Sequence, residues 1–162
     1  MKNLVIMCTD ARFAPATVEY FNCQFASHQL IIECYAGGVV EYAHDNSSRL
    51  IENAKYIGID KIFILLHDDC GYYNHLYGTD GDIERNMSYQ MRDATKVGAA
   101  LTESGIEFEI ITCKLLSNKI KIVDQYYDFD DNSHADQVFV YPAIDALASF
   151  IQIGNKKYDR YS

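Results

Sequence analysis

Short apolar-rich runs recur along this chain, and they constrain its fold more than any other feature of the sequence. They span residues 4–7, 30–34, 62–66 and 108–112, and those at 4–7 and 62–66 are unbroken. Runs of this kind are typical of strands that are buried on both faces, as the strands of parallel sheets are. Segments with a helical spacing of apolar residues lie between them. Strands that alternate with helices predict an α/β fold, with a mainly parallel β-sheet of about four to five strands and helices on both faces.

Helix signals define three of the intervening segments. Pro15 fits the first turn of a helix that continues to about Phe21, and Gly58 ends a second helix that begins near Asn46. A third helix is predicted over about residues 83–103. Its inward-facing residues are expected to be Met87, Met91, Ala94 and Leu101.

The C-terminal part of the chain has weaker signals. Residues 120–123 and 138–141 are predicted as edge strands or hairpin pieces, residues 144–151 as a short helix, and about 155–162 as a polar tail. With 162 residues, of which 49% are apolar, the chain has the size and composition of one globular unit. We therefore predict a single α/β domain over residues 1–162.

The net charge of the chain is −9. Because nucleic acids and anionic membranes are bound mainly through Lys and Arg, neither is expected as a partner, and a small-molecule substrate is favoured. No apolar stretch is long enough to span a bilayer. The five cysteines lack the short spacings of a disulfide framework, which indicates a reducing compartment and a cytoplasmic protein.

Three candidate metal ligands follow predicted strands. Cys8 comes after the first strand, and His67 and Cys70 come after the third. Open α/β sheets place their sites at the carboxyl ends of the strands, so these side chains are expected near one another. Two thiolates and an imidazole suit zinc and leave a fourth position for water or substrate. The residues alone leave open that Cys8 is a small buried apolar side chain and His67 a hydrogen-bonded loop residue.

Short motifs surround these candidate ligands. They read Cys8-Thr9-Asp10-Ala11-Arg12, Ala36-Gly37-Gly38 and His67-Asp68-Asp69-Cys70-Gly71. In type, order and approximate spacing they resemble the motifs of the β-carbonic anhydrases, over roughly residues 4–113. Members of that family usually carry an N-terminal helical arm, whereas this sequence begins almost at its first strand and so resembles a short member. The family's usual Arg-Asn before Ala-Gly is replaced by Cys34-Tyr35.

The resemblance implies a zinc lyase of the carbonic anhydrase type, a carbonate dehydratase. Such an enzyme hydrates carbon dioxide reversibly to bicarbonate with a zinc-bound hydroxide, which an Asp-Arg dyad orients. Carried over to this sequence, the zinc ligands are Cys8, His67 and Cys70, and the catalytic dyad is Asp10 and Arg12. The candidate substrate-binding residues are Gly37 and Gly38.

Several alternatives stay open at this point. Hydrolysis of carbonyl sulfide or carbon disulfide on the same scaffold is one, and a non-catalytic zinc-binding homologue is another. Asp10 is expected either to pair with Arg12 or to swing onto the fourth zinc position at lower pH. The family also implies a homodimer or a higher homo-oligomer.

The remaining cysteines and one histidine have weaker claims to chemistry. Cys23, Cys34 and Cys113 lie in or beside predicted helices and strands, where core packing is the favoured role. His75 could relay protons, but a solvated side chain is the favoured interpretation. Asp68 and Asp69 are explained by helix capping or solvation.

Overall fold

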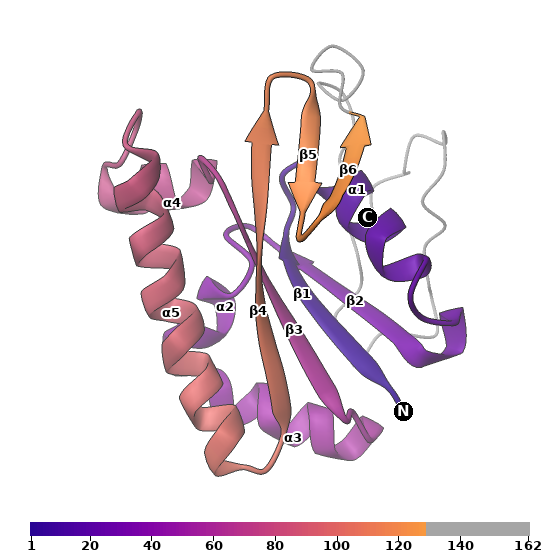
Figure 1. Ribbon diagram of the computed structural model, residues 1–162. Coiled ribbons are helices and arrows are strands. Elements are labelled where there is room, and N and C mark those ends of the chain that lie inside the picture. The colour runs from indigo at the N-terminus through magenta and orange to yellow at the C-terminus, as the bar shows by residue number, and fades with distance from the viewer. Residues whose placement is uncertain (129–162) are drawn as a thin grey trace, which may run out of the picture.

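Six strands form one sheet in the computed structural model, which describes residues 1–128 (Figure 1). In chain order the elements are β1 (Asn3–Cys8), α1 (Ala14–Asn22), η1 (Ser27–Gln29), β2 (Leu30–Tyr35), α2 (Val40–Ala43), α3 (Ser47–Ile57), β3 (Lys61–His67), α4 (Gly71–Tyr77), α5 (Ile83–Glu103), β4 (Glu107–Leu116), β5 (Lys119–Ile122) and β6 (Gln125–Asp128).

The sheet has a parallel part and an antiparallel part. Its strand order is β2-β1-β3-β4-β5-β6. The first four strands in this order pair in parallel, and β5 and β6 extend the sheet as an antiparallel hairpin. The predicted α/β class, with a mainly parallel sheet covered on both faces, is confirmed.

The sheet contains a strand that the sequence did not indicate. β6 pairs with β5 across a turn in which Val123 has a φ of +54°. Hairpin turns that need a positive φ are normally recognised by Gly, Asn or Asp, and a β-branched residue gives no such signal. The described sheet therefore has six strands, where about four to five were expected.

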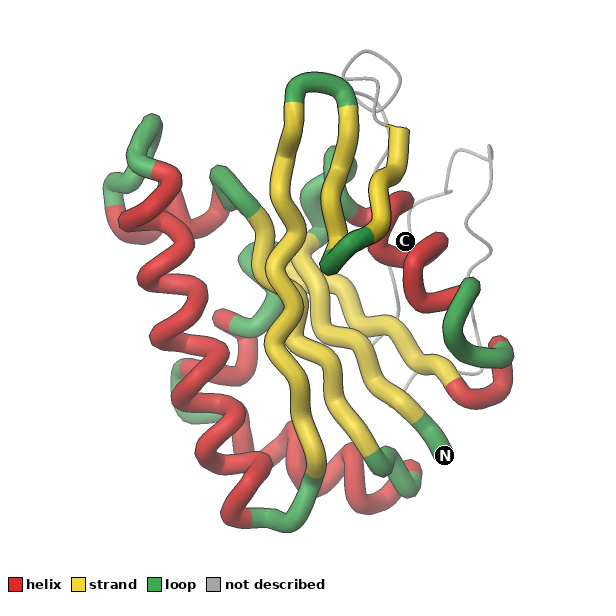
Figure 2. The backbone as a smooth tube through the Cα atoms, in the orientation of Figure 1, coloured by secondary structure: helices red, strands yellow, loops and turns green. Residues whose placement is uncertain are grey.

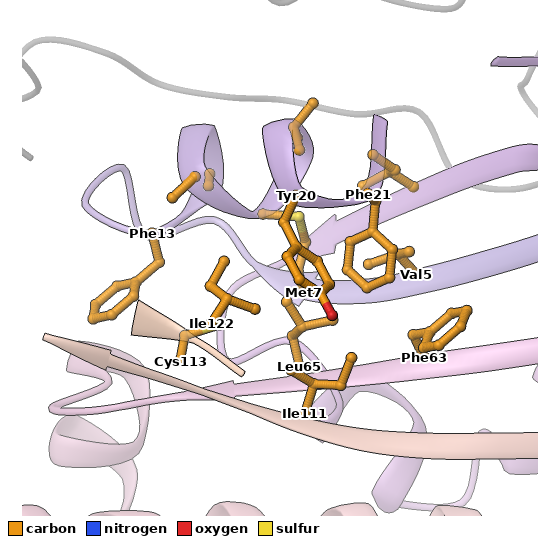
Figure 3. Close-up of a cluster of buried hydrophobic side chains, with 14 of the residues drawn as sticks. Val5, Met7, Phe13, Tyr20, Phe21, Phe63, Leu65, Ile111, Cys113 and Ile122 are labelled. Atoms are coloured by element: carbon orange, nitrogen blue, oxygen red, sulfur yellow. The ribbon is translucent and has the colours of Figure 1, made fainter. Parts of the chain in front are cut away.

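Alternate side chains of the central strands enter two separate cores. On β1, Val5 and Met7 pack toward α1, while Leu4 and Ile6 pack toward α3 and α5. Figure 3 shows the first of these cores, where Phe21 and Phe63 lie between the sheet and α1. The backbone trace shows the same arrangement of a helix on one face and the longer helices on the other (Figure 2). Burial on both faces explains the unbroken apolar runs.

Local signals set the helix ends. Pro15 lies in the first turn of α1, and α3 ends at Gly58, whose φ is +75°. At the start of α5 the Asp82 side chain accepts a hydrogen bond from the backbone N–H of Arg85 at 3.0 Å. Such caps satisfy backbone groups that have no partner within the helix. The predicted helices over residues 83–103 and up to Gly58 are both confirmed.

One prediction about α5 is wrong in part. Ala94 and Leu101 are buried and Met87 packs partly against the core, but Met91 is 38% exposed. The N-terminal half of the buried stripe consists of polar side chains instead. They are Asn86, Gln90 and Asp93.

Some predictions lie outside the described residues. These are the strand piece over 138–141, the helix over 144–151 and the tail over 155–162. The single domain over 1–162 stays a prediction for the same reason. Among the helices of residues 1–128, none combines the length and apolarity that crossing a membrane requires.

Candidate metal centre

The sheet brings the three predicted ligands to one edge. Cys8 is the last residue of β1, His67 is the last residue of β3, and Cys70 directly precedes α4. β1 and β3 are neighbours, and their pairing runs only as far as Ile6 and Ile64. The ligand-bearing ends therefore lie just beyond the paired segment, where side chains from both strands face a common space.

The three ligand atoms have the spacing of a metal site. The sulfurs of Cys8 and Cys70 and a ring nitrogen of His67 all lie within 4.8 Å of one another, and all three residues are buried. The two sulfurs are 3.8 Å apart. Tetrahedral zinc with Zn–S bonds of about 2.3 Å places two sulfurs about 3.8 Å apart, so the pair already has the separation that zinc needs.

His67 presents one nitrogen without a partner. Its Nδ1 lies 3.0 Å from the backbone oxygen of Asp68, so Nδ1 carries the proton and donates it to that carbonyl. Nε2 is buried and has no hydrogen-bond partner among the described residues. An unpartnered buried acceptor is costly, and a metal ion at this position would satisfy it. The donor set and its geometry thus fit zinc.

The two thiols are hydrogen-bonded to each other, and this bond shifts their pKa values in opposite directions. The hydrogen bond to Cys70, followed by burial, raises the pKa of the Cys8 thiol to about 12. The same bond lowers the pKa of Cys70 against the effect of burial, and backbone N–H groups of Tyr73 and Tyr72 add to this. A thiolate is the species that binds metal, so metal binding has to displace the proton of Cys8.

Asp10 and Arg12 form a close ion pair beside this cluster. The Arg12 Nη2 donates to Asp10 Oδ2 at 2.7 Å, and Nε donates to Oδ1 at 3.0 Å. The backbone N–H of Arg12 also donates to Oδ1, at 3.0 Å. Burial is the largest single influence on Asp10 and favours its protonation, but Arg12 and the nearby His67 outweigh it and lower the pKa of the carboxyl. The structure thus holds Asp10 on Arg12 as a carboxylate.

A second contact anchors the guanidinium to the β3 side of the site. Arg12 Nη2 donates to the backbone oxygen of Asp69 at 2.9 Å, and Nη1 lies 3.5 Å from Asp69 Oδ2. The other carboxylate oxygen of Asp69 accepts from Asn74 at 2.7 Å. Asp68 accepts from the backbone N–H of Leu115 at 3.1 Å. Both carboxylates therefore tie the loop after β3 to neighbouring elements, Asp69 to α4 and Asp68 to β4, and neither caps α4.

Gly37 and Gly38 lie in the turn after β2, with φ of +73° and +57°. A Cβ on Gly38 would stand 3.1 Å from the backbone nitrogen of Cys8 and from the carbonyl carbon of Met7. A Cβ on Gly37 would stand 2.6 Å from the ring of Tyr72. The absence of a Cβ at Gly38 allows this turn to pack closely against the end of β1, and the absence of one at Gly37 leaves room for Tyr72. Their predicted role in substrate binding stays a prediction.

The predictions for the remaining cysteines are confirmed in part. Cys34 and Cys113 are buried as predicted, but Cys23 is exposed at the end of α1, so its predicted core role is wrong. Helix α1 ends at Asn22 and the next residue turns toward solvent. His75 lies on an exposed face of α4.

A cavity of about 480 Å³ lies next to the cluster. Its wall includes Val40, which packs with Cys8 and Cys70. The side chains of Tyr35, Tyr72 and Tyr77 also line it. Neither the three ligands nor the Asp10–Arg12 pair lines it, so it neighbours the metal centre without being part of it.

Sequence reasoning missed the polar side chains of α5 that contact the site. Asn86 and Gln90 are fully buried, and each bonds to the backbone of one candidate ligand. A signal was present in the sequence, because Asn86 and Gln90 extend the apolar spacing of Ala94, Val97 and Leu101 toward the N-terminus of the helix. Polar residues in line with a buried stripe indicate a buried network.

No family model matches the chain, and no curated protein matches it either. Similar solved structures include a tetrameric β-carbonic anhydrase from Sordaria macrospora, with 16% identity, a TM-score of 0.47 and coverage of 78% of this chain and 82% of that chain. A β-carbonic anhydrase from Aspergillus fumigatus is 13% identical, with a TM-score of 0.48 and coverage of 76% and 75%. One from Trichomonas vaginalis is 14% identical, with a TM-score of 0.48 and coverage of 77% and 83%. These values describe a partial likeness of backbones.

Proposed function

We propose that this chain is a zinc-dependent lyase that hydrates carbon dioxide reversibly to bicarbonate. The observation that carries the proposal is the buried cluster of Cys8, His67 and Cys70, with its sulfurs 3.8 Å apart and its histidine nitrogen unpartnered. Three protein ligands leave one position of a tetrahedral ion open, which is the arrangement of catalytic zinc sites. The order and spacing of the motifs around these residues support the same function.

The chain's own residues have distinct roles in this reaction. Zinc, when bound, supplies Lewis-acid chemistry that makes water a nucleophile near neutral pH. Asp10, kept ionised by Arg12, accepts a hydrogen bond from the nucleophile and so aims its lone pair at the substrate carbon. Arg12 fixes the carboxylate by donating from Nε and Nη2, and its contact with Asp69 fixes the guanidinium in turn.

The thiolates also set the electrostatic balance of the site. Two thiolates cancel the charge of Zn²⁺, whereas three neutral histidines leave it uncancelled. We therefore expect the nucleophile to ionise at a higher pH than at a three-histidine site, so that turnover rises on the alkaline side, while the Asp10–Arg12 pair orients the nucleophile. We extend the proposal to a homo-oligomeric assembly, which sedimentation of the full chain would test.

The deciding experiment compares three substrates on protein with a measured zinc content. We expect turnover of carbon dioxide by zinc-loaded protein and its loss after chelation. Carbonyl sulfide and carbon disulfide serve as the competing substrates in parallel assays. Preferred turnover of either would replace the proposed substrate while keeping the zinc chemistry. Inactivity on all three with full zinc occupancy would leave a metal-binding protein without the proposed reaction.

A further inference from the structure

Gln90, on α5, makes two hydrogen bonds to the backbone of His67. Its Oε1 accepts from the His67 N–H at 3.2 Å, and its Nε2 donates to the His67 carbonyl at 2.8 Å. His67 pairs with Cys113 on β4, but on its other side the β1–β3 pairing has already ended at Ile64. The amide side chain thus makes the two bonds that a neighbouring strand would have made.

Asn86 does the same for Cys70. Its Oδ1 accepts from the Cys70 N–H at 3.3 Å, and its Nδ2 donates to the Cys70 carbonyl at 3.0 Å. Asn86 and Gln90 lie one helical turn apart on α5, and Gln90 Nε2 donates to Asn86 Oδ1 at 2.7 Å. The backbones of two candidate ligands are therefore held by two side chains that are also bonded to each other. We call Asn86 and Gln90 the amide clamp.

The amide clamp continues into the rest of the site. Asn86 Nδ2 donates to Asn74 Oδ1 at 2.7 Å, and Asn74 Nδ2 donates to Asp69 Oδ1 at 2.7 Å. Asp69 is the residue that contacts Arg12. A chain of hydrogen bonds thus runs from the long helix to the Asp10–Arg12 pair. Asn86 is 0% and Gln90 2% exposed, so water cannot replace these bonds.

Neutral amides can hold the backbone of a metal ligand in a way that neither a carboxylate nor an apolar side chain can. Each amide has one donor group and one acceptor, which matches the N–H and C=O of one residue. A carboxylate could accept from the N–H but could not donate to the carbonyl, and it would add negative charge beside two thiolates. Leu or Met would fill the space but leave both backbone groups unpaired.

We propose that Asn86 and Gln90 are positioning residues that preset His67 and Cys70 for the metal before the ion binds. The inference rests on the proposed zinc site. Fixing the N–H and C=O of both ligand residues removes backbone freedom that metal binding would otherwise have to remove, so the clamp raises affinity by pre-organisation. It also directs the two side chains toward one point, which sets the geometry of the bound ion.

The test uses the full chain with Gln90→Met and Asn86→Leu, which keep the volume and charge but remove the bonds. The zinc dissociation constant is measured by competition with a chromophoric chelator under reducing conditions. Loss of partners around ligand residues typically weakens metal binding by about 10- to 100-fold, and we expect a loss in this range for each variant. The visible spectrum of the cobalt-substituted protein should also change, because it reports the geometry at the ion.

Thr79→Val is the matched control. Thr79 is 1% exposed, donates to Asn74 Oδ1 at 2.8 Å and accepts from Asn86 Nδ2 at 3.1 Å. The variant therefore loses buried hydrogen bonds of the same network but leaves in place the bonds from Asn86 and Gln90 to the backbones of the ligand residues. It should lower Tm but leave the zinc dissociation constant and the cobalt spectrum unchanged. If Gln90→Met or Asn86→Leu does not fold, Gln90→Asn and Asn86→Gln are used, since each keeps a neutral amide but changes its reach to the ligand backbone, and the same loss of zinc affinity is expected.

The outcomes separate the two claims. Weaker zinc binding with an altered cobalt spectrum in the clamp variants, and neither change in Thr79→Val, supports the clamp. Wild-type affinity and an unchanged spectrum in the clamp variants overturn it while leaving the zinc site in place. An equal loss in Thr79→Val also overturns it, because the effect would then be one of general stability. A wild-type chain that binds no zinc refutes the proposed function, and the clamp with it.

Discussion

The two strand ends that carry the candidate ligands are held by opposite kinds of chemistry. At the end of β1 the loop is organised by charge, through Asp10 and Arg12, whose side chains are 15% and 26% exposed. At the end of β3 the backbones of the ligand residues themselves are held by the neutral amide clamp, which is closed to solvent. In the proposed reaction the charged pair would act on the substrate, whereas the neutral hydrogen bonds hold the backbone of the ligand residues.

Electrostatics accounts for this division. A buried carboxylate at position 86 or 90 would lie close to two thiolates and would be costly to keep ionised. The Asp10 carboxylate avoids this cost because Arg12 donates to both of its oxygens. The β1 side should therefore govern turnover and the β3 side metal affinity. The following predictions break or sharpen this contrast.

The largest effect is expected from removing a ligand on either side. Cys8→Ser and Cys70→Ser should each reduce the zinc content of purified protein to near zero, because two remaining ligands do not hold the ion. Elemental analysis measures the result. Cys113→Ala is the control, since this buried thiol lies outside the cluster and should keep full zinc. Wild-type zinc content in Cys70→Ser would remove the basis of the site.

Asp10→Asn should separate turnover from metal binding. We expect a loss in kcat/KM for carbon dioxide of about 100-fold or more with unchanged zinc content, because an amide donates where the carboxylate must accept. Gln90→Met should show the reverse pattern, with weakened zinc binding. Asp45→Asn, which changes an exposed carboxyl in another loop, is the control. Near-wild-type turnover in Asp10→Asn would disprove the assignment of charge to catalysis.

Zinc affinity should rise with pH by about tenfold per unit if one proton leaves for each ion bound. The sign follows from Cys8, whose pKa of about 12 keeps it protonated in the metal-free protein at neutral pH. Lowering the pH adds competing protons and weakens binding, and raising it does the opposite. Competition titrations at several pH values give the slope. A flat profile would mean that zinc binds without displacing a proton from Cys8, contrary to the raised pKa of this thiol.

The smallest effect concerns the glycine that presses on β1. Gly38→Ala should lower the free energy of unfolding by about 1–2 kcal/mol for the positive φ and by about 1–3 kcal/mol more for the contact with Cys8. Gly58→Ala is the matched control, because its φ is also positive but its Cβ would meet nothing within 4 Å. Denaturant unfolding of both variants isolates the contact. Equal losses would show that the approach to Cys8 has no energetic consequence.

Much of the parallel half of the fold could be predicted because local signals and burial agree there. The runs that form β1 and β3 are apolar on both faces, and Pro15 and Gly58 mark helix ends by their own backbone preferences. The antiparallel edge was predicted less well. Val123 takes a conformation that its side chain disfavours, so tertiary pairing decides the turn.

The site shows a similar limit. The ligand residues carry distinctive side chains at strand ends, so their convergence could be predicted from topology. Gln90 and Asn86 could not be predicted in the same way, because amides are common on exposed helix faces and only long-range contacts show what they bond to. Hydrophobic spacing also predicts Met91 rather than Gln90 as the inward-facing residue, because it assigns apolar side chains to the core. The structure shows Gln90 buried and Met91 38% exposed.

The distance along the chain between the ligands has a consequence for folding kinetics. Cys8 and Cys70 are separated by 62 positions, and they meet only after β1 and β3 have paired. Contacts this distant in sequence form late, so an ion bound between them stabilises the native state far more than the folding transition state. Zinc should therefore slow unfolding with little effect on the rate of folding, which stopped-flow experiments with and without chelator can measure. The metal would thus bind only after the strands have paired during folding, and it would have to leave before they separate during unfolding.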